Sequence, residues 1–307
     1  MRLKTRTFLT AVLIACCFIA GGAARASAQG TPWDVANDAA EAALARGDHA
    51  EAERKHLEAL KHAEKIGPKY PQTVATLTRL AALYEKQMKP AEAESAYRRA
   101  VESAEALAAA KDSHFASVAP EMHAASLERL ADFLSTRKKF NEAEGTYKRA
   151  LDVLARAAGA DEKTPKTNDE WMGFLVKAAA GGTEARYAAV ADKLAVLYLT
   201  HDRFAEAEPL FKLSVAAQER VGGEKPNPNL GVTLENLGVL YARQGRFEQA
   251  EPHFRRALQV YERSLGPEHA QMAPALDAYS LLLAKLGREG EAAAARERAR
   301  AIRAKVR

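Results

Sequence analysis

The sequence predicts an all-α protein, a signal peptide followed by a solenoid of about six stacked helix-turn-helix repeats. Three observations predict this fold class. The 307-residue chain opens with a short basic and apolar segment. Apolar and small residues then recur at the spacing of one helix face through the rest of the chain. One residue pattern also returns every 41 to 64 positions, as in proteins built from stacked helical units.

The first 28 residues have the layout of a signal peptide. Arg2, Lys4 and Arg6 precede an uncharged apolar stretch from Phe8 to Ala20, which is too short to span a bilayer comfortably. The small residues Ala26-Ser27-Ala28 suit the pocket of a signal peptidase. We therefore expect cleavage after Ala28 and a periplasmic or secreted mature protein.

A second export signal overlaps the first. The stretch Leu13-Ile14-Ala15-Cys16 resembles a lipobox, in which Cys16 would become the lipidated first residue. The apolar run continues past this cysteine, which favours ordinary cleavage. Contact with a membrane is expected only if Cys16 is lipidated, and the protein would then be a lipid-anchored assembly factor at the outer membrane.

Cleavage also removes the apparent basic character of the chain. The segment holds Arg2, Lys4, Arg6 and Arg25 and no acidic residue, so the 45 basic residues fall to 41 against 40 acidic ones. This balance does not predict a nucleic-acid partner. Both cysteines of the chain lie in the same segment, so the mature chain has no disulfide or thiol chemistry.

The repeat is clearest between residues 231 and 264. A first apolar stripe at the spacing i, i+3, i+4, i+7 predicts one helix, which ends at Gly245. A second stripe predicts another helix, which ends at Gly266-Pro267 because proline cannot continue a helix. The first stripe is Leu234, Leu237, Gly238 and Tyr241, and the second is Ala250, Phe254, Ala257, Leu258 and Tyr261. Two such helices need neighbours to bury both stripes.

The neighbouring repeats are marked by one alanine in each second helix. We call these six residues the register alanines: Ala52, Ala93, Ala143, Ala207, Ala250 and Ala292. A bulky aromatic residue follows four positions later in the middle repeats, at Tyr97, Tyr147, Phe211 and Phe254. The predicted repeats span residues 33–66, 74–107, 124–157, 188–221, 231–264 and 273–306, within a domain of residues 29–307.

These motifs resemble the tetratricopeptide repeat family over residues 33 to 303. Spacings of 41 to 43, with Gly67 to Pro71 and Leu265 to His269 between units, resemble the longer variant found in kinesin light chains. The resemblance implies a superhelix whose concave groove, lined by first helices, holds a peptide or a partner protein. Polar substitutions in the first and last units suit capping repeats.

The resemblance also implies which residues point into the groove. The position after the first stripe residue holds Asn37, Thr78, Glu128, Asp192, Glu235 and Asp277, and the position one turn later holds Asp132, Val196, Val239 and Leu281. The C-terminal half is thus expected to be an apolar floor edged by carboxylates, suited to a ligand with basic and apolar side chains. The alternative is that these acids form an ordinary solvated face.

A long insertion at residues 158–186 separates the third and fourth repeats. It contains Trp171 and Phe174. Its apolar end could fold back over exposed core, or these aromatic residues could anchor a partner, as exposed aromatics often do.

No pattern in the sequence predicts catalysis. Phosphate-binding, dinucleotide-binding and nucleophile-elbow motifs are missing. The eight histidines include no pair four residues apart with a carboxylate, so neither a metal nor another cofactor is expected. We expect a non-enzymatic interaction scaffold in the bacterial cell envelope. An enzyme with a site near the 158–186 insertion is the weaker alternative.

Overall fold

A computed structural model describes residues 30–67, 70–110, 114–159, 184–221 and 226–305. The signal segment with Cys16 lies outside the described residues. So does most of the 158–186 insertion, with Trp171 and Phe174.

The described part of the chain is all-helical, and its twelve helices form six consecutive pairs. The first helices of the pairs are α2 (Pro32–Ala45), α4 (Pro71–Lys86), α6 (Ala119–Thr136), α9 (Glu184–Thr200), α11 (Pro228–Arg243) and α13 (Met272–Lys285). The second helices are α3 (His49–Ile66), α5 (Pro90–Ala109), α7 (Phe140–Ala157), α10 (Phe204–Val221), α12 (Phe247–Leu265) and α14 (Glu289–Lys305). The predicted all-α repeat architecture is confirmed.

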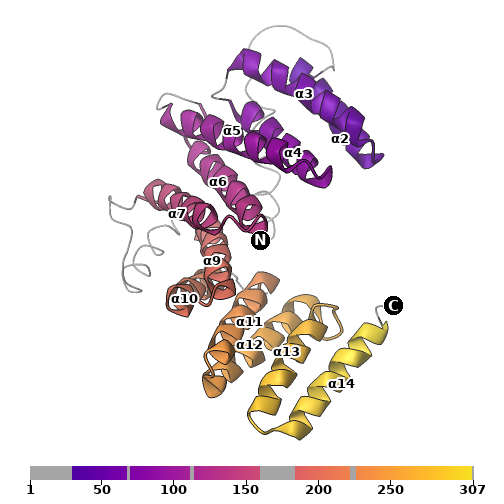
Figure 1. Ribbon diagram of the computed structural model, residues 1–307, viewed down its shortest axis with the longest axis vertical. Helices are drawn as coiled ribbons and strands as arrows, with labels where there is room; N and C mark the ends of the chain where they lie inside the picture. Colours follow the sequence, from indigo (N-terminus) through magenta and orange to yellow (C-terminus); the bar gives the residue numbers. More distant parts are fainter. Residues whose placement is uncertain (1–29, 68–69, 111–113, 160–183, 222–225, 306–307) are drawn as a thin grey trace, which may run out of the picture.

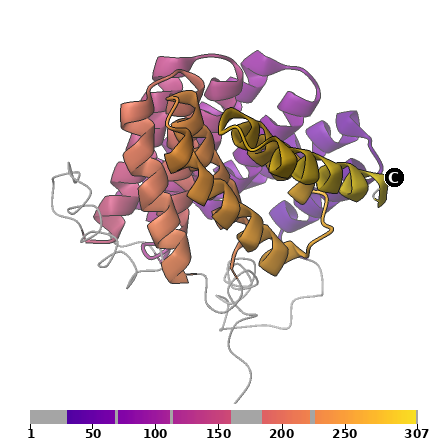
Figure 2. The same ribbon diagram turned by 90° about the horizontal axis from the view of Figure 1, so that it is seen from below.

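The pairs stack into a curved solenoid (Figure 1). Each second helix packs on the first helix of the next pair, and α11 also packs against both α9 and α13. Successive pairs are rotated, so that α14 runs across the direction of the orange helices when the solenoid is seen from below (Figure 2). The first helices α4 and α6 are likewise in direct contact.

The core repeats along the chain with the register alanines. All six are fully buried, and the aromatic residue four positions later is buried in each of the four middle repeats. The packing is close at Gly231 and Gly238, where an added methyl group would lie 2.5 Å from the ring of Tyr261 and 2.8 Å from the ring of Phe254. Full burial of one large apolar side chain stabilises by about 1.5–3 kcal/mol, so these contacts dominate the stability of the stack.

Each turn between paired helices is closed by one residue in the left-handed conformation. It lies five positions before the register alanine in all six repeats. Glycine occupies this position at Gly47, Gly245 and Gly287, and side-chain residues occupy it at Met88, Lys138 and Asp202. Only glycine adopts this conformation without steric cost.

A charged contact joins every pair of neighbouring repeats. The glutamate after each of the first five register alanines accepts from the basic residue that precedes the second helix of the next repeat. We call these contacts the inter-repeat clamps: Lys89–Glu53 at 2.9 Å, Lys139–Glu94 at 2.9 Å, Arg203–Glu144 at 2.5 Å, Arg246–Glu208 at 3.4 Å and Arg288–Glu251 at 2.7 Å. The glutamates of the Ala-Glu pairs therefore lie at the repeat junctions.

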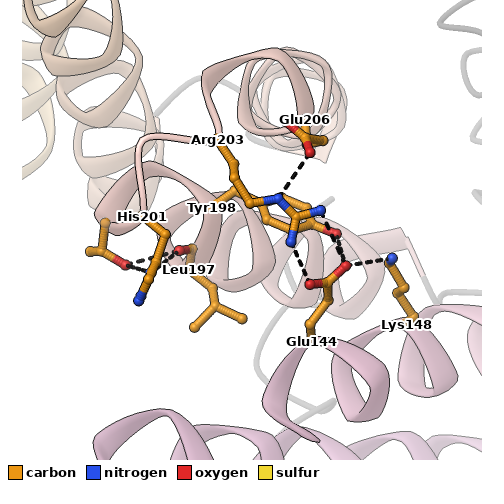
Figure 3. A network of polar contacts seen from close by, with 8 residues as sticks. Glu144, Lys148, Leu197, Tyr198, His201, Arg203 and Glu206 are labelled. Carbon is orange, nitrogen blue, oxygen red and sulfur yellow. Dashed lines mark hydrogen bonds and ion pairs between the residues drawn. The ribbon is translucent and has the colours of Figure 1, made fainter. Parts of the chain in front are cut away.

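The most highly connected clamp surrounds Glu144 (Figure 3). Besides Arg203, its carboxylate accepts from Lys148 at 2.6 Å and from the Tyr198 hydroxyl at 2.9 Å. Burial opposes ionisation, but these three donors together lower the pKa of Glu144 to about 2. Partly exposed ion pairs contribute only about 0–1 kcal/mol each, so the clamps fix the alignment of the repeats more than they stabilise them.

The last helix ends the stack with a polar outer side. In α14 the buried residues are Ala292, Ala299 and Ile302, while Glu297 and Arg300 are exposed. This is the arrangement expected of a capping repeat.

The turns provide a test of the repeat alignment. Lys138→Gly should raise the free energy of unfolding by about 0.5–1 kcal/mol, because it relieves a left-handed side-chain residue that costs roughly 1–2 kcal/mol. Gly245→Ala should lower it by about 1 kcal/mol. The control Lys61→Gly, at an exposed helical position of α3, should also be destabilising. Urea and thermal unfolding measure all three, and a Lys138→Gly protein less stable than wild type would contradict the assignment.

Candidate functional site

The candidate site is a stripe of residues along the first helices, most of them at least partly exposed. Three residues per helix, separated by four and then three positions, lie on one side of each helix. We call this set the first-helix stripe. Its members are Asn37, Glu41 and Leu44; Thr78, Ala82 and Glu85; Glu128, Asp132 and Ser135; Asp192, Val196 and Leu199; Glu235, Val239 and Ala242; and Asp277, Leu281 and Ala284.

The chemistry of the stripe changes halfway along the solenoid. Its second position holds Glu41, Ala82 and Asp132 in the first three repeats, and Val196, Val239 and Leu281 in the last three. The third position is likewise apolar in each of the last three repeats. The apolar floor expected of the C-terminal half therefore forms one continuous set of equivalent positions.

In the first two repeats the polar stripe residues are satisfied within the protein. Asn37 is buried and accepts from Arg79 at 2.8 Å, and Arg79 also pairs with Glu41 at 3.2 Å. The hydroxyl of Thr78 donates to the Val74 carbonyl at 2.8 Å. The Oδ1 atom of Asn37 and the hydroxyl hydrogen of Thr78 are thus already used in bonds within the protein.

In the third repeat the two predicted carboxylates are held by cations of the fourth. Glu128 pairs with Arg186 at 2.9 Å and with Lys193 at 2.6 Å. Asp132 pairs with Lys193 at 2.6 Å and accepts from the Tyr147 hydroxyl at 2.5 Å. These carboxylates form a charge network between α6 and α9, so their charges are compensated without a ligand.

Asp192, in the fourth repeat, has a different environment. Its Oδ1 atom is closed off from solvent and accepts no hydrogen bond from the described residues. Burial raises the pKa of Asp192 to about 6, while the Thr233 hydroxyl and the charge of Lys193 offset this effect only in part. The charged form of Asp192 is therefore poorly compensated within the described protein.

Glu235 and Asp277 continue the line of carboxylates. Glu235 accepts from the Tyr261 hydroxyl at 3.1 Å, and burial raises the pKa of Glu235 despite this bond. Asp277 is ion-paired with Arg303 of its own repeat. Of the predicted carboxylates, Asp192 and Glu235 are thus the two that lack a cationic partner among the described residues.

The apolar residues between these carboxylates remain accessible. Val196 and Val239 are partly exposed, and Leu281 is 68 % exposed. Single exposed apolar residues are ordinary in proteins, but these three occupy the same stripe position in consecutive repeats. Contact of the stripe with a partner stays a prediction.

Sequence reasoning missed the cations that neutralise the third repeat. Arg186 and Lys193 are seven residues apart in α9, which places them on one side of the helix. Lys193 follows the stripe residue Asp192 directly, as Arg79 follows Thr78. The position directly after a stripe residue, shared by Arg79 and Lys193, was the signal that could have identified Lys193.

Within the described residues, no group of histidine, cysteine and carboxylate side chains has the arrangement of a metal site. None of the described helices is both long and apolar enough to cross a membrane. In the C-terminal half of the stripe, aliphatic side chains lie between carboxylates.

Comparison with known proteins places these features in a family. Tetratricopeptide repeat models match residues 34–106 and 229–305 and residues 123–161. A comparison with curated proteins found no match.

Solved structures share the fold. BtubC from P. vanneervenii is 20% identical, with a TM-score of 0.61 over 92% of this chain and 93% of that one. Kinesin light chain-like repeats from Podosopora anserina are 19% identical, with a TM-score of 0.52 over 78% of this chain and 97% of that one. Pseudomonas aeruginosa pilF is 17% identical, with a TM-score of 0.51 over 86% of this chain and 88% of that one. The family models match more than half of the described helical stack, and the chain belongs to the tetratricopeptide repeat family.

Proposed function

We propose that the protein is a non-enzymatic scaffold that binds an extended segment of a partner protein along the first-helix stripe of repeats four to six. The observation that carries this proposal is the unbroken set Val196, Val239 and Leu281, one per repeat, at a position that holds Glu41, Ala82 and Asp132 in the other half of the solenoid. Tetratricopeptide repeats generally serve as interaction scaffolds, and the aliphatic set supports a contact through apolar side chains.

The N-terminal half is a poorer candidate for the same contact. Most charged groups of its stripe are already ion-paired, and Glu85 accepts from the Tyr97 hydroxyl at 2.5 Å. A ligand there would have to displace Arg186 and Lys193 from Glu128 and Asp132. Breaking partly buried ion pairs leaves uncompensated charge. Binding is therefore expected to concentrate in the C-terminal three repeats.

The site of action that we propose is the periplasm or the outside of the cell. The proposal rests on the basic and apolar N-terminal segment and the small residues before position 29. The mass of the protein purified from its host distinguishes the two forms of export. A mature chain that begins at Gln29 supports ordinary cleavage, whereas a lipid-modified chain that begins at Cys16 would show a membrane-anchored assembly factor. A chain that retains Met1 would contradict export by either route.

Site-specific crosslinking in the host tests the binding surface. A photoreactive amino acid at Val239 or Leu281 should give a discrete adduct with a partner, and Val239→Arg should reduce partner capture about tenfold or more, because an unpaired charge would have to be desolvated. The matched control is the same amino acid at Glu297, which is exposed on α14. Adducts of equal yield at Glu297, or none from the stripe, would contradict the proposal.

A further inference from the structure

The charge network between α6 and α9 depends on two positions of the later helix. Arg186 lies six residues before the first stripe residue of α9, and Lys193 lies directly after it. Both reach back to the stripe of the preceding repeat, where they meet Glu128 and Asp132. Arg79 occupies the position of Lys193 in α4 and reaches back to Asn37 and Glu41 in the same way.

The same two positions are uncharged in both of the first helices that follow α9. In α11 they are Asn229 and Asn236, and in α13 they are Gln271 and Ala278. In α9 these two positions reach back to the stripe of the preceding repeat. By the same geometry, the positions of α11 would meet Asp192, and those of α13 would meet Glu235. The series of cations that reaches back along the stripe therefore stops at Lys193, although the series of carboxylates continues.

The contacts of α11 support this alignment. Thr233 lies beside Asp192 and one helical turn before Asn236, so the side of α11 that carries Asn236 is directed toward α9. An uncompensated carboxylate in a partly buried site is costly, and a cation that arrives with a ligand removes that cost. Glu128 shows that this surface accommodates both an arginine and a lysine beside a carboxylate.

We propose that the partner of repeats four to six inserts a lysine or arginine side chain at the α9–α11 junction, where it pairs with Asp192 and takes the place that Lys193 has beside Glu128. Aliphatic side chains of the same segment lie along Val196, Val239 and Leu281. The inference rests on the proposed function and adds the chemistry of the partner, which is a basic residue within an aliphatic segment.

The test uses three fluorescent peptides and the purified protein. The peptides share one aliphatic sequence of leucine and valine about ten residues long, and they differ only in a central lysine, glutamine or glutamate. Fluorescence anisotropy should show the lysine peptide binding about tenfold more tightly than the glutamine peptide, with the glutamate peptide weakest. Equal affinities, or no binding of the lysine peptide, would overturn the inference.

Two variants locate the preference at the junction. Asp192→Asn should remove the preference for lysine over glutamine because it removes the charge, and Asn236→Lys should remove it because the protein then supplies its own cation. Glu128→Gln is the matched control, since that carboxylate is already paired, and the preference should survive in it. A lysine preference that persists in both Asp192→Asn and Asn236→Lys would overturn the assignment of the site.

A further variant separates this inference from the proposed function. Leu281→Arg should weaken all three peptides if the stripe is the binding surface. Loss of binding in Leu281→Arg together with no lysine preference in the wild type would reject only the partner chemistry. Unchanged binding of every peptide in Leu281→Arg would reject the binding surface itself. Circular dichroism confirms that each variant is folded before binding is compared.

Discussion

Burial across the repeat junctions is the constraint on which the whole structure depends. A single pair of short helices has an apolar stripe on each helix and only one partner, so it must pack against the pairs before and after it. The register alanines, all fully buried, allow the helices to approach closely. The inter-repeat clamps then fix which residues meet at each junction. Because the junctions are alike, equivalent residues of successive first helices necessarily lie along one surface.

Because equivalent positions share one surface, side-chain differences between repeats change the chemistry of that surface. A solenoid with one backbone pattern can change the chemistry of its surface by changing one side chain per repeat, without any change in the stack. Here the first three repeats carry a mostly polar stripe in which Glu41, Glu128 and Asp132 are ion-paired, and the last three carry aliphatic stripe residues beside Asp192 and Glu235. The change occurs where Arg186 and Lys193 are followed by Asn229 and Asn236. Two positions in one helix thus separate the ion-paired carboxylates Glu128 and Asp132 from Asp192 and Glu235.

The fold could be predicted from the sequence because its signals are periodic. The register alanines, the aromatic residues after them and the helix-ending glycines are local patterns that repeat. The side-chain residues in the left-handed turns, such as Lys138, could not be predicted from residue type alone, since the alignment of all six repeats places them there. The candidate site was predicted only in part. The carboxylates Asp192 and Glu235 and the aliphatic set can be placed on the stripe from the sequence, and their contact with a partner stays a prediction. The neutralisation of Glu128 depends on which helix faces which, and this is a property of the three-dimensional stack.

The binding surface is defined most directly by one carboxyl group, Asp192, which is partly buried and has no ion-paired cation among the described residues. The decisive measurement is the titration of Asp192 in the folded protein, followed by carbon-detected NMR of its side-chain carboxyl carbon and assigned with the Asp192→Asn variant. The account predicts a pKa of about 6, and a lower value once Asn236→Lys supplies a cation. A pKa near the usual 3.8 in the wild type would show that the charge is already compensated, and would contradict the account.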